Sequence, residues 1–216
     1  MSDHYFSADP DSQERRRPVT ATVWGHELNL QSSSGVFAAG RLDVGTAVLF
    51  RETKAPSRDG TYLDLGCGYG VIACALATAV PAADVWGVDV NERALRLCAD
   101  NAAALGLADR VRAVAPDDVP DEMQFDEIWS NPPIRIGKPA LHDLLLTWLP
   151  RLAADGRAVL VVGKNLGADS LQRWLGEQGY PTKRLASAKG FRVLESRPGP
   201  DQPSDASSEA GSTEPG

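Results

Sequence analysis

The fold of this chain is decided at Leu63-Asp64-Leu65-Gly66-Cys67-Gly68-Tyr69-Gly70, where a strand pattern meets a helix pattern through a glycine-rich turn. Residues 61–65 predict a buried strand and residues 71–80 an apolar helix. Glycines at such a turn relieve backbone strain and let the main chain come close to a ligand. The stretch therefore predicts the first strand-to-helix unit of an α/β domain.

The same alternation continues downstream. We expect strands at 84–88, 111–114, 126–130 and 157–162, and helices at 92–105, 138–153 and 169–177, the second of these interrupted near its ends by Pro139 and Pro150. Asn91 and Asp169 are the expected N-caps. Two last strands follow at 180–186 and 191–195, joined by a turn at Lys189-Gly190.

Strands that alternate with helices predict a parallel sheet covered on both faces. Because the last two strands have no helix between them, we expect the final strand to run antiparallel. Upstream, residues 19–24 and 27–31 predict a hairpin, and residues 42–50 a short helix. The predicted fold is α/β and doubly wound, Rossmann-like, with a mostly parallel seven-stranded sheet, an antiparallel last strand and an N-terminal β-hairpin extension.

Length and composition indicate one soluble domain with two polar ends. The 216 residues carry a net charge of −7, which argues against a general nucleic-acid coat protein. We expect an N-terminal arm at 1–18, a hairpin and helix extension at 19–56, an α/β domain at 57–196 and a disordered acidic tail at 197–216.

No apolar run is long enough to span a membrane, and the N-terminus lacks the form of a signal peptide, so we expect a cytoplasmic protein. Three cysteines and three histidines are scattered along the chain, without close metal-ligand spacing. We therefore expect neither a metal site nor disulfide bonds.

The glycine loop differs from a dinucleotide fingerprint. It reads G-x-G-x-G, with Val71 where G-x-G-x-x-G has its third glycine. Asp64 lies two residues before the first glycine, where a carboxylate would repel a pyrophosphate but would suit an ammonium or a sulfonium. Asp89 ends the next strand and is placed to accept ribose hydroxyls. These features favour a nucleoside cofactor with a cationic end.

A second motif, Asn131-Pro132-Pro133-Ile134, ends the strand at 126–130. Two prolines cannot continue a strand because they lack the N–H group and fix φ. In an open α/β sheet, the carboxyl ends of the strands bind ligands. The turn presents an amide and proline carbonyls there, which suits the NH₂ group of a base or an amide.

Together these motifs resemble class I methyltransferases that use S-adenosylmethionine, with the glycine loop as motif I, Asp89 as post-I and the Asn131 turn as motif IV. The fuller pattern is similar to the bacterial small-subunit ribosomal RNA guanine-N2 methyltransferase family and its shorter relatives, over roughly residues 4–195. Further similar segments are 4–7, 34–37, 43–46, 89–95 and 189–191. The longer family members have an additional N-terminal half, which is a degenerate copy of the same domain, whereas this chain has one copy of that domain.

The resemblance implies a role for each motif residue. The cofactor-binding set is Asp64, Gly66, Cys67, Gly68, Gly70, Asp89, Val90, Asp117 and Asn131. The catalytic set is Asn131, Pro132, Pro133 and Ile134, and the candidate substrate contacts are Phe37, Arg135, Lys138, Lys164 and Lys189. Ile134 stands where base-methylating relatives often have an aromatic ring, so stacking worth about 1–3 kcal/mol per base is not available from it.

The expected activity is methyl transfer from S-adenosylmethionine to an exocyclic amino group, with guanine N2 of ribosomal RNA as the leading target and RNA as the partner. The alternatives are a protein glutamine methyltransferase, a small-molecule N-methyltransferase, and a non-catalytic domain of the same fold. A dehydrogenase is disfavoured by the loop pattern and by Asp64. The sequence leaves the oligomeric state open.

Overall fold

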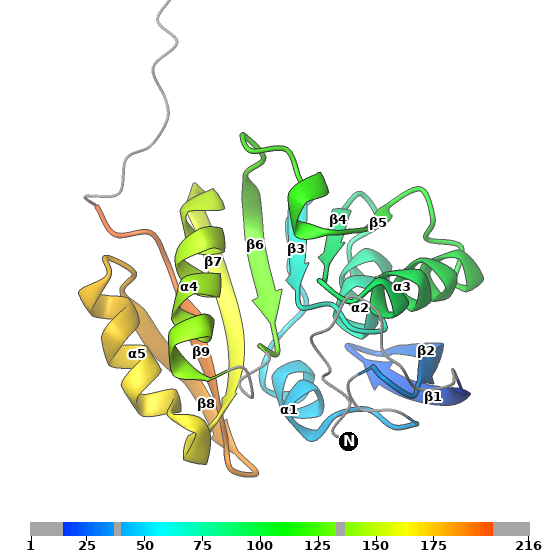
Figure 1. The fold of residues 1–216 in the computed structure, drawn as a ribbon, viewed down its shortest axis with the longest axis horizontal. Helices are drawn as coiled ribbons and strands as arrows, with labels where there is room; N and C mark the ends of the chain where they lie inside the picture. Colours follow the sequence, from blue (N-terminus) through cyan, green and yellow to red (C-terminus); the bar gives the residue numbers. More distant parts are fainter. Residues whose placement is uncertain (1–14, 37–39, 133–136, 201–216) are drawn as a thin grey trace, which may run out of the picture.

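A seven-stranded sheet forms the centre of the computed structural model, which describes residues 15–36, 40–132 and 137–200 (Figure 1). The strand order is β5-β4-β3-β6-β7-β9-β8. The strands are β3 (Thr61–Leu65), β4 (Asp84–Val88), β5 (Val111–Val114), β6 (Phe125–Ser130), β7 (Leu152–Gly163), β8 (Thr182–Ala188) and β9 (Phe191–Ser196). The first five strands in this order, from β5 to β7, pair in parallel with their neighbours. β9 runs antiparallel to both of its neighbours, β7 and β8. The predicted sheet is therefore confirmed.

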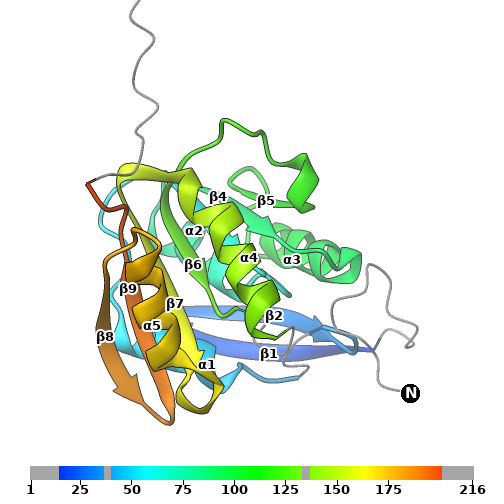
Figure 2. The same cartoon turned by 60° about the vertical axis from the view of Figure 1, so that its left-hand side comes forward.

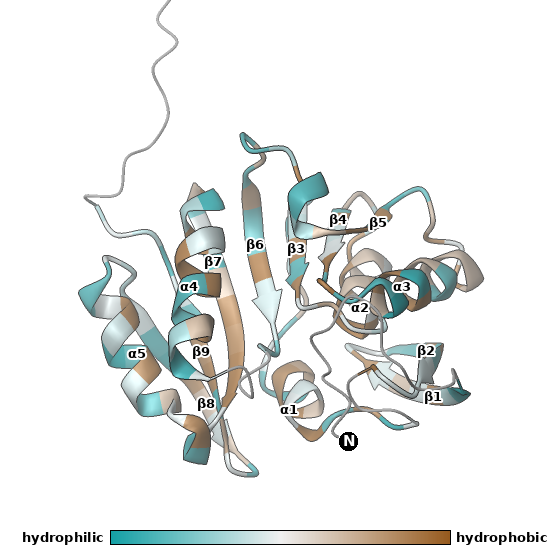
Figure 3. Ribbon diagram, in the orientation of Figure 1, coloured by the Kyte–Doolittle hydropathy of each residue, from teal (hydrophilic) through white to brown (hydrophobic). Residues whose placement is uncertain are grey.

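Helices cover both faces of the sheet (Figure 2). They are α1 (Val44–Glu52), α2 (Val71–Ala79), α3 (Glu92–Ala104), α4 (Lys138–Trp148) and α5 (Ala168–Glu177). Alternate strand residues face opposite sides, so Trp129 and Val159 pack in the core under α1, α2 and α3, whereas Ile128 and Leu160 pack under α4 and α5. Figure 3 shows apolar residues along part of β7 and hydrophilic ones on exposed turns of α3.

The N-terminal extension is a hairpin of β1 (Arg16–Val23) and β2 (His26–Ser33). Its turn, Trp24-Gly25, has φ angles of 48° and 87°, the left-handed pair that a two-residue hairpin turn requires. Asn101 of α3 holds β2 in place, because its side chain accepts a hydrogen bond from the Gln31 amide at 2.7 Å and donates one to the Gln31 carbonyl at 2.8 Å. The same amide group donates to the carbonyl of Tyr69, so the hairpin is tied to the glycine loop.

The largest differences from the expected bounds are at α4 and β7. The predicted helix at 138–153 ends at Trp148, followed by a 3-10 turn at Leu149–Arg151, because Pro150 has no N–H group for a helical hydrogen bond. Strand β7 begins at Leu152, where it pairs with Phe125, rather than at residue 157.

At the start of α5, the expected cap Asp169 was wrong. The N-cap is Gly167 with φ of 93°, and Asp169 instead accepts a hydrogen bond from Arg192 at 3.3 Å. Near the C-terminus, backbone hydrogen bonds continue beyond β9, and the Gly199 amide donates to the Gly179 carbonyl at 2.9 Å. The chain is thus held for at least two residues past the expected start of the tail, and residues 201–216 lie outside the described residues.

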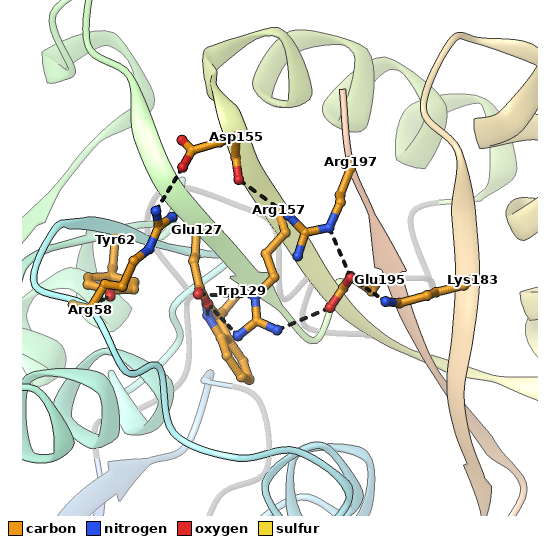
Figure 4. Close-up of polar contacts among 9 residues, drawn as sticks. All are labelled: Arg58, Tyr62, Glu127, Trp129, Asp155, Arg157, Lys183, Glu195 and Arg197. Atoms are coloured by element: carbon orange, nitrogen blue, oxygen red, sulfur yellow. Dashed lines mark hydrogen bonds and ion pairs between the residues drawn. The ribbon is translucent and has the colours of Figure 1, made fainter. Parts of the chain in front are cut away.

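A network of charged side chains joins four strands on the α1 side of the sheet (Figure 4). Arg157 of β7 contacts Glu127 of β6 at 3.0 Å and Glu195 of β9 at 3.1 Å, and Lys183 of β8 contacts Glu195 at 2.9 Å. Burial raises the pKa of Glu195, but hydrogen bonds from Lys183 and Arg157 outweigh it and the pKa is lowered. Trp129 donates to Glu127 at 2.8 Å. Since these charges are paired across β6, β7, β9 and β8, we assign the network to holding the sheet together.

Candidate functional site

The predicted motifs meet at the carboxyl ends of three neighbouring strands. The glycine loop follows β3, Asp89 follows β4 and Asn131 follows β6, and these strands are adjacent in the order β4-β3-β6. The chain progresses outward from β3 to β5 on one side and from β6 to β7 on the other. In open α/β sheets, this reversal of direction opens the crevice that binds the ligand.

The glycine loop is held by the neighbouring strand. The amides of Gly66 and Cys67 both donate to the carbonyl of Val88, at 2.8 and 3.0 Å. Gly66, Gly68 and Gly70 have φ angles of 75°, 54° and 81°, a left-handed backbone that other residues rarely adopt. The sequence therefore needs glycine at all three positions to make this turn.

Gly70 and Gly68 also differ in what surrounds them. A Cβ atom on Gly70 would lie 2.5 Å from the Sγ atom of Cys98, so this glycine lets α3 pack against the loop. A Cβ atom on Gly68 would meet only Val36, at 3.9 Å. Gly68 is thus the glycine whose surroundings leave room for a ligand against the main chain.

Asp89 links the loop to the end of β4. Its Oδ2 atom accepts a hydrogen bond from the Gly68 amide at 2.9 Å, and its Oδ1 atom accepts one from the Asn91 amide at 2.9 Å. Burial raises the pKa of Asp89, and the hydrogen bonds from these amides oppose that rise. Each carboxylate oxygen keeps a further lone pair that can accept from a hydroxyl. Val90, next in the chain, is 51% exposed and gives this edge an apolar surface.

Asp64 is a buried carboxylate with one unsatisfied oxygen. It is 1% exposed, and its Oδ2 atom accepts a hydrogen bond from the Ala73 amide at 2.9 Å. Its Oδ1 atom has no partner among the described residues. Burial raises the pKa of Asp64 to about 7, and the negative charge of Asp89 adds to the rise. A buried acceptor without a partner costs about 1–3 kcal/mol, which a ligand ammonium would offset. The site therefore fits the cationic amino-acid end of S-adenosylmethionine.

Asn131 is held in one orientation by α1. Its Nδ2 group donates to the Oδ1 atom of Asp43 at 2.7 Å and to the Oγ1 atom of Thr46 at 3.0 Å. A carboxylate only accepts, so the nitrogen of the amide must face Asp43 and the oxygen must face away. That oxygen accepts no hydrogen bond from any residue that the structure describes. The arrangement leaves Asn131 with one free function, which is that of an acceptor.

Asp43 is a site residue for which the sequence motifs predict no role. It is the N-cap of α1, and the same Oδ1 atom accepts from the Thr46 amide at 3.1 Å. The close packing of Gly45 fixes the start of α1, because a Cβ atom there would lie 2.9 Å from the Phe191 ring. The segments 43–46 and 189–191, both part of the family resemblance, thus meet in the structure. Their similarity was the available signal, but it did not identify Asn131 as the partner of Asp43.

The remaining predicted residues lie around the carboxyl ends of the strands or outside the described residues. Asp117 is exposed in a 3-10 turn at Pro116–Asp118, just after β5, and Pro132 is buried. Lys138, Lys164 and Lys189 are exposed. Phe37, Pro133, Ile134 and Arg135 lie outside the described residues, so their proposed roles stay predictions.

Residues 15–36, 40–132 and 137–200 contain no group of three or more His, Cys, Asp or Glu side chains placed to hold a metal ion. They also contain no helix with the length and apolar character that a membrane crossing requires.

Comparison with known proteins finds a matching family model and curated relatives that cover most of the chain. Residues 27–195 match the model of the family described as the methyltransferase small domain. The chain is 30% identical over 200 residues to the uncharacterized protein YbxB of Bacillus subtilis, covering 91% of this chain and 99% of YbxB. It is 34% identical over 196 residues to ribosomal RNA small subunit methyltransferase C of Pseudomonas aeruginosa, but covers only 57% of that protein's length and 88% of its own.

The solved structures show the same fold. The 16S rRNA N2 G1207 methyltransferase RsmC of T. thermophilus, in complex with AdoMet and guanosine, superposes with a TM-score of 0.68 at 23% identity, covering 85% of this chain and 50% of that one. A ribosomal protein L11 methylase from Lactobacillus delbrueckii superposes with a TM-score of 0.55 at 21% identity, covering 74% of this chain and 84% of that one.

Proposed function

Because this chain belongs to the methyltransferase small domain family and is an S-adenosylmethionine-dependent methyltransferase, we propose that it methylates an exocyclic amino group, namely guanine N2 in ribosomal RNA. The observation that carries the proposal is the Asn131 amide, fixed by Asp43 and Thr46 with its oxygen left to accept. The names of the Pseudomonas and Thermus relatives support ribosomal RNA as the substrate class.

Five groups of this chain would hold the cofactor in our proposal. Asp64 faces its ammonium group, directly or through one water molecule, and the backbone at Gly68 lies along its methionine and ribose portions. Asp89 accepts from the ribose hydroxyls, and the exposed side chain of Val90 packs on the adenine. We retain Asp117 as the candidate acceptor for the adenine amino group. S-adenosylmethionine supplies an electrophilic methyl group on its sulfonium.

Asn131 positions the amine that is methylated. An exocyclic amine is a weak nucleophile because its lone pair is delocalised into the ring. The Asn131 oxygen accepts one N–H of this amine, and we propose the Pro132 carbonyl as the second acceptor. Two fixed acceptors align the nitrogen and disperse the positive charge that develops on it. Alignment of this kind supplies up to about 7–11 kcal/mol in favourable cases.

The proposed reaction needs no basic side chain. Of the two histidines in the described ranges, His26 lies at the hairpin turn, and His142 of α4 stacks on Trp174 of α5 at a ring separation of 3.5 Å. Once the amine nitrogen has gained the methyl group, one of its protons is acidic enough to pass to solvent water. The work of the site is therefore orientation and electrostatic stabilisation.

Methyl transfer to defined substrates tests the proposal. The purified protein would be incubated with methyl-labelled S-adenosylmethionine and deproteinised small-subunit ribosomal RNA, intact subunits, or total protein, all from a strain that lacks the gene. We expect label in RNA and its recovery as N2-methylguanosine after digestion to nucleosides. Label in protein, in another nucleoside, or in none of the substrates would contradict the proposed target.

A further inference from the structure

One segment near the C-terminus of this acidic chain carries an excess of positive charge. Residues 164–192 have a formal charge of +4, within a chain whose net charge is −7, so the rest of the chain carries −11. The cations of the segment are Lys164, Arg173, Lys183, Arg184, Lys189 and Arg192, and its only acids are Asp169 and Glu177. An excess of this size within 29 residues predicts a surface that attracts anions.

The segment folds into one surface at the edge of the sheet. α5 lies over β9 and β8, and β8 is the outermost strand (Figures 1 and 2). Between α5 and β8 runs a groove of about 400 Å³, lined by Asp169, Gln172, Arg173, Gly176, Thr182 and Arg184. Arg173 comes from the helix and Arg184 from the strand, so two guanidinium groups line the same groove.

Four of these cations have no acidic partner among the described residues. Arg192 is paired with Asp169, and Lys183 with Glu195. By contrast, Arg173, Arg184, Lys164 and Lys189 are exposed, and none of them forms an ion pair with the described part of the chain. An unpaired guanidinium offers five donors in a planar arrangement that matches a phosphate group.

This surface continues to the edge where Asn131 lies. β8 runs parallel to β7, because each is antiparallel to β9, so both strands end at the same side of the sheet. The Lys164 amide donates to the Gly190 carbonyl at 2.7 Å, which places Lys164 beside the turn that contains Lys189. From β6 to β8 there are three strand spacings, or about 14 Å. A single RNA strand that enters the site at Asn131 can therefore reach these cations.

We propose that the surface of Lys164, Lys189, Arg173 and Arg184 binds the phosphate backbone of the RNA next to the target nucleotide. The inference rests on the proposed function, since it takes RNA as the substrate. The cations at the turn receive the strand where it leaves the site, and the α5–β8 groove receives the following phosphates. An acidic protein partner is the rival occupant, and the test below separates it.

The test is the double substitution Arg173→Ala with Arg184→Ala. RNA affinity would be measured by fluorescence anisotropy on a small-subunit RNA fragment, at several salt concentrations. We expect the Kd to rise roughly tenfold near physiological salt, and the slope of log affinity against log salt to become less steep by about 1.4, because two contacts with single-stranded phosphate are lost. The affinity for S-adenosylhomocysteine, measured by calorimetry, should stay within twofold of wild type.

A matched control removes two other exposed cations that form no ion pair with the described residues, with Arg17→Ala and Lys54→Ala, outside residues 164–192. It should leave RNA affinity within twofold of wild type. An equal loss in this control, or wild-type RNA affinity in the Arg173/Arg184 variant, would overturn the proposed surface and leave methylation of RNA standing. If the wild-type protein binds S-adenosylhomocysteine but neither binds nor methylates RNA, the proposed function fails as well. Binding of polyglutamate instead of RNA would indicate the acidic protein partner.

Discussion

Asp43 is the residue whose loss should separate orientation from binding. Its Oδ1 atom accepts from Asn131 at 2.7 Å and from the Thr46 amide at 3.1 Å. A hydrogen bond to a charged group contributes about 1.5–3 kcal/mol, and loss of an N-cap costs about 0.5–2 kcal/mol. Asp43→Ala should therefore lower kcat by about 10- to 100-fold, since 1.4 kcal/mol of barrier is a factor of ten. The free energy of unfolding should fall by the cost of the lost N-cap, about 0.5–2 kcal/mol.

Asp43→Ser distinguishes the two effects. Serine is also a good N-cap, but its shorter side chain withdraws the acceptor from Asn131. This variant should keep a Tm near that of wild type and still lose most of kcat. The assays are single-turnover methyl transfer, KM for S-adenosylmethionine, and thermal unfolding. A purely structural role would raise KM or lower Tm together with kcat. A kcat of Asp43→Ala within twofold of wild type would refute this role of Asp43.

Four further predictions concern the cofactor end of the site. Because the pKa of Asp64 is raised to about 7 and a ligand ammonium favours its charged form, affinity for S-adenosylhomocysteine should rise as pH increases through 7, with proton release in calorimetry. Asp64→Asn should abolish this pH dependence. A flat pH profile of the wild-type affinity would count against the contact between Asp64 and the ammonium group. Because the pKa of Asp64 is higher in the folded than in the unfolded state, the free energy of unfolding should fall as pH rises from about 4 to about 7, by up to about 4 kcal/mol. The Asp64→Asn variant should lack this slope. Asp89→Ala removes the acceptor of the Gly68 amide and should weaken S-adenosylhomocysteine binding at least tenfold, so unchanged calorimetric affinity would exclude the ribose role. Gly70→Ala, whose Cβ atom would meet Cys98 at 2.5 Å, should lower the free energy of unfolding by about 3 kcal/mol or more, whereas Gly68→Ala should cost only the left-handed backbone term of about 1–2 kcal/mol; equal denaturation midpoints would contradict this difference.

Local pattern was enough to predict most of the sheet. β3, β4 and β5 begin and end at the predicted residues, because each is a short apolar run bounded by turn residues or by the next helix. The start of β7 could not be predicted in this way. Residues 152–156 become strand through pairing with β6 at Phe125, and a pairing partner 27 positions away leaves no local signal. The hairpin likewise extends back to Arg16, a polar position whose strand conformation comes from pairing with Ser33.

The residues of the site show the same difference between local motifs and long-range contacts. Asp64, Asp89 and the glycines were predictable because motif spacing places them at the ends of adjacent strands. Asp43 was not, because its contact with Asn131 spans 88 positions and exists only once α1 packs against β7, the strand next to β6. The unsatisfied oxygen of Asp64 was also beyond the sequence, since it depends on which amide of α2 reaches the other oxygen.

The central claim is that the Asn131 oxygen positions the amine for methyl transfer and does not hold the cofactor in place. One comparison tests it most directly: single-turnover methyl transfer by wild type and by Asn131→Ala, each saturated with S-adenosylmethionine and with RNA, with S-adenosylhomocysteine affinity measured on the same preparations. We predict a fall in the transfer rate of at least about 100-fold, with cofactor affinity changed by less than threefold. A transfer rate near that of wild type, or a loss of cofactor affinity equal to the loss of rate, would contradict the claim.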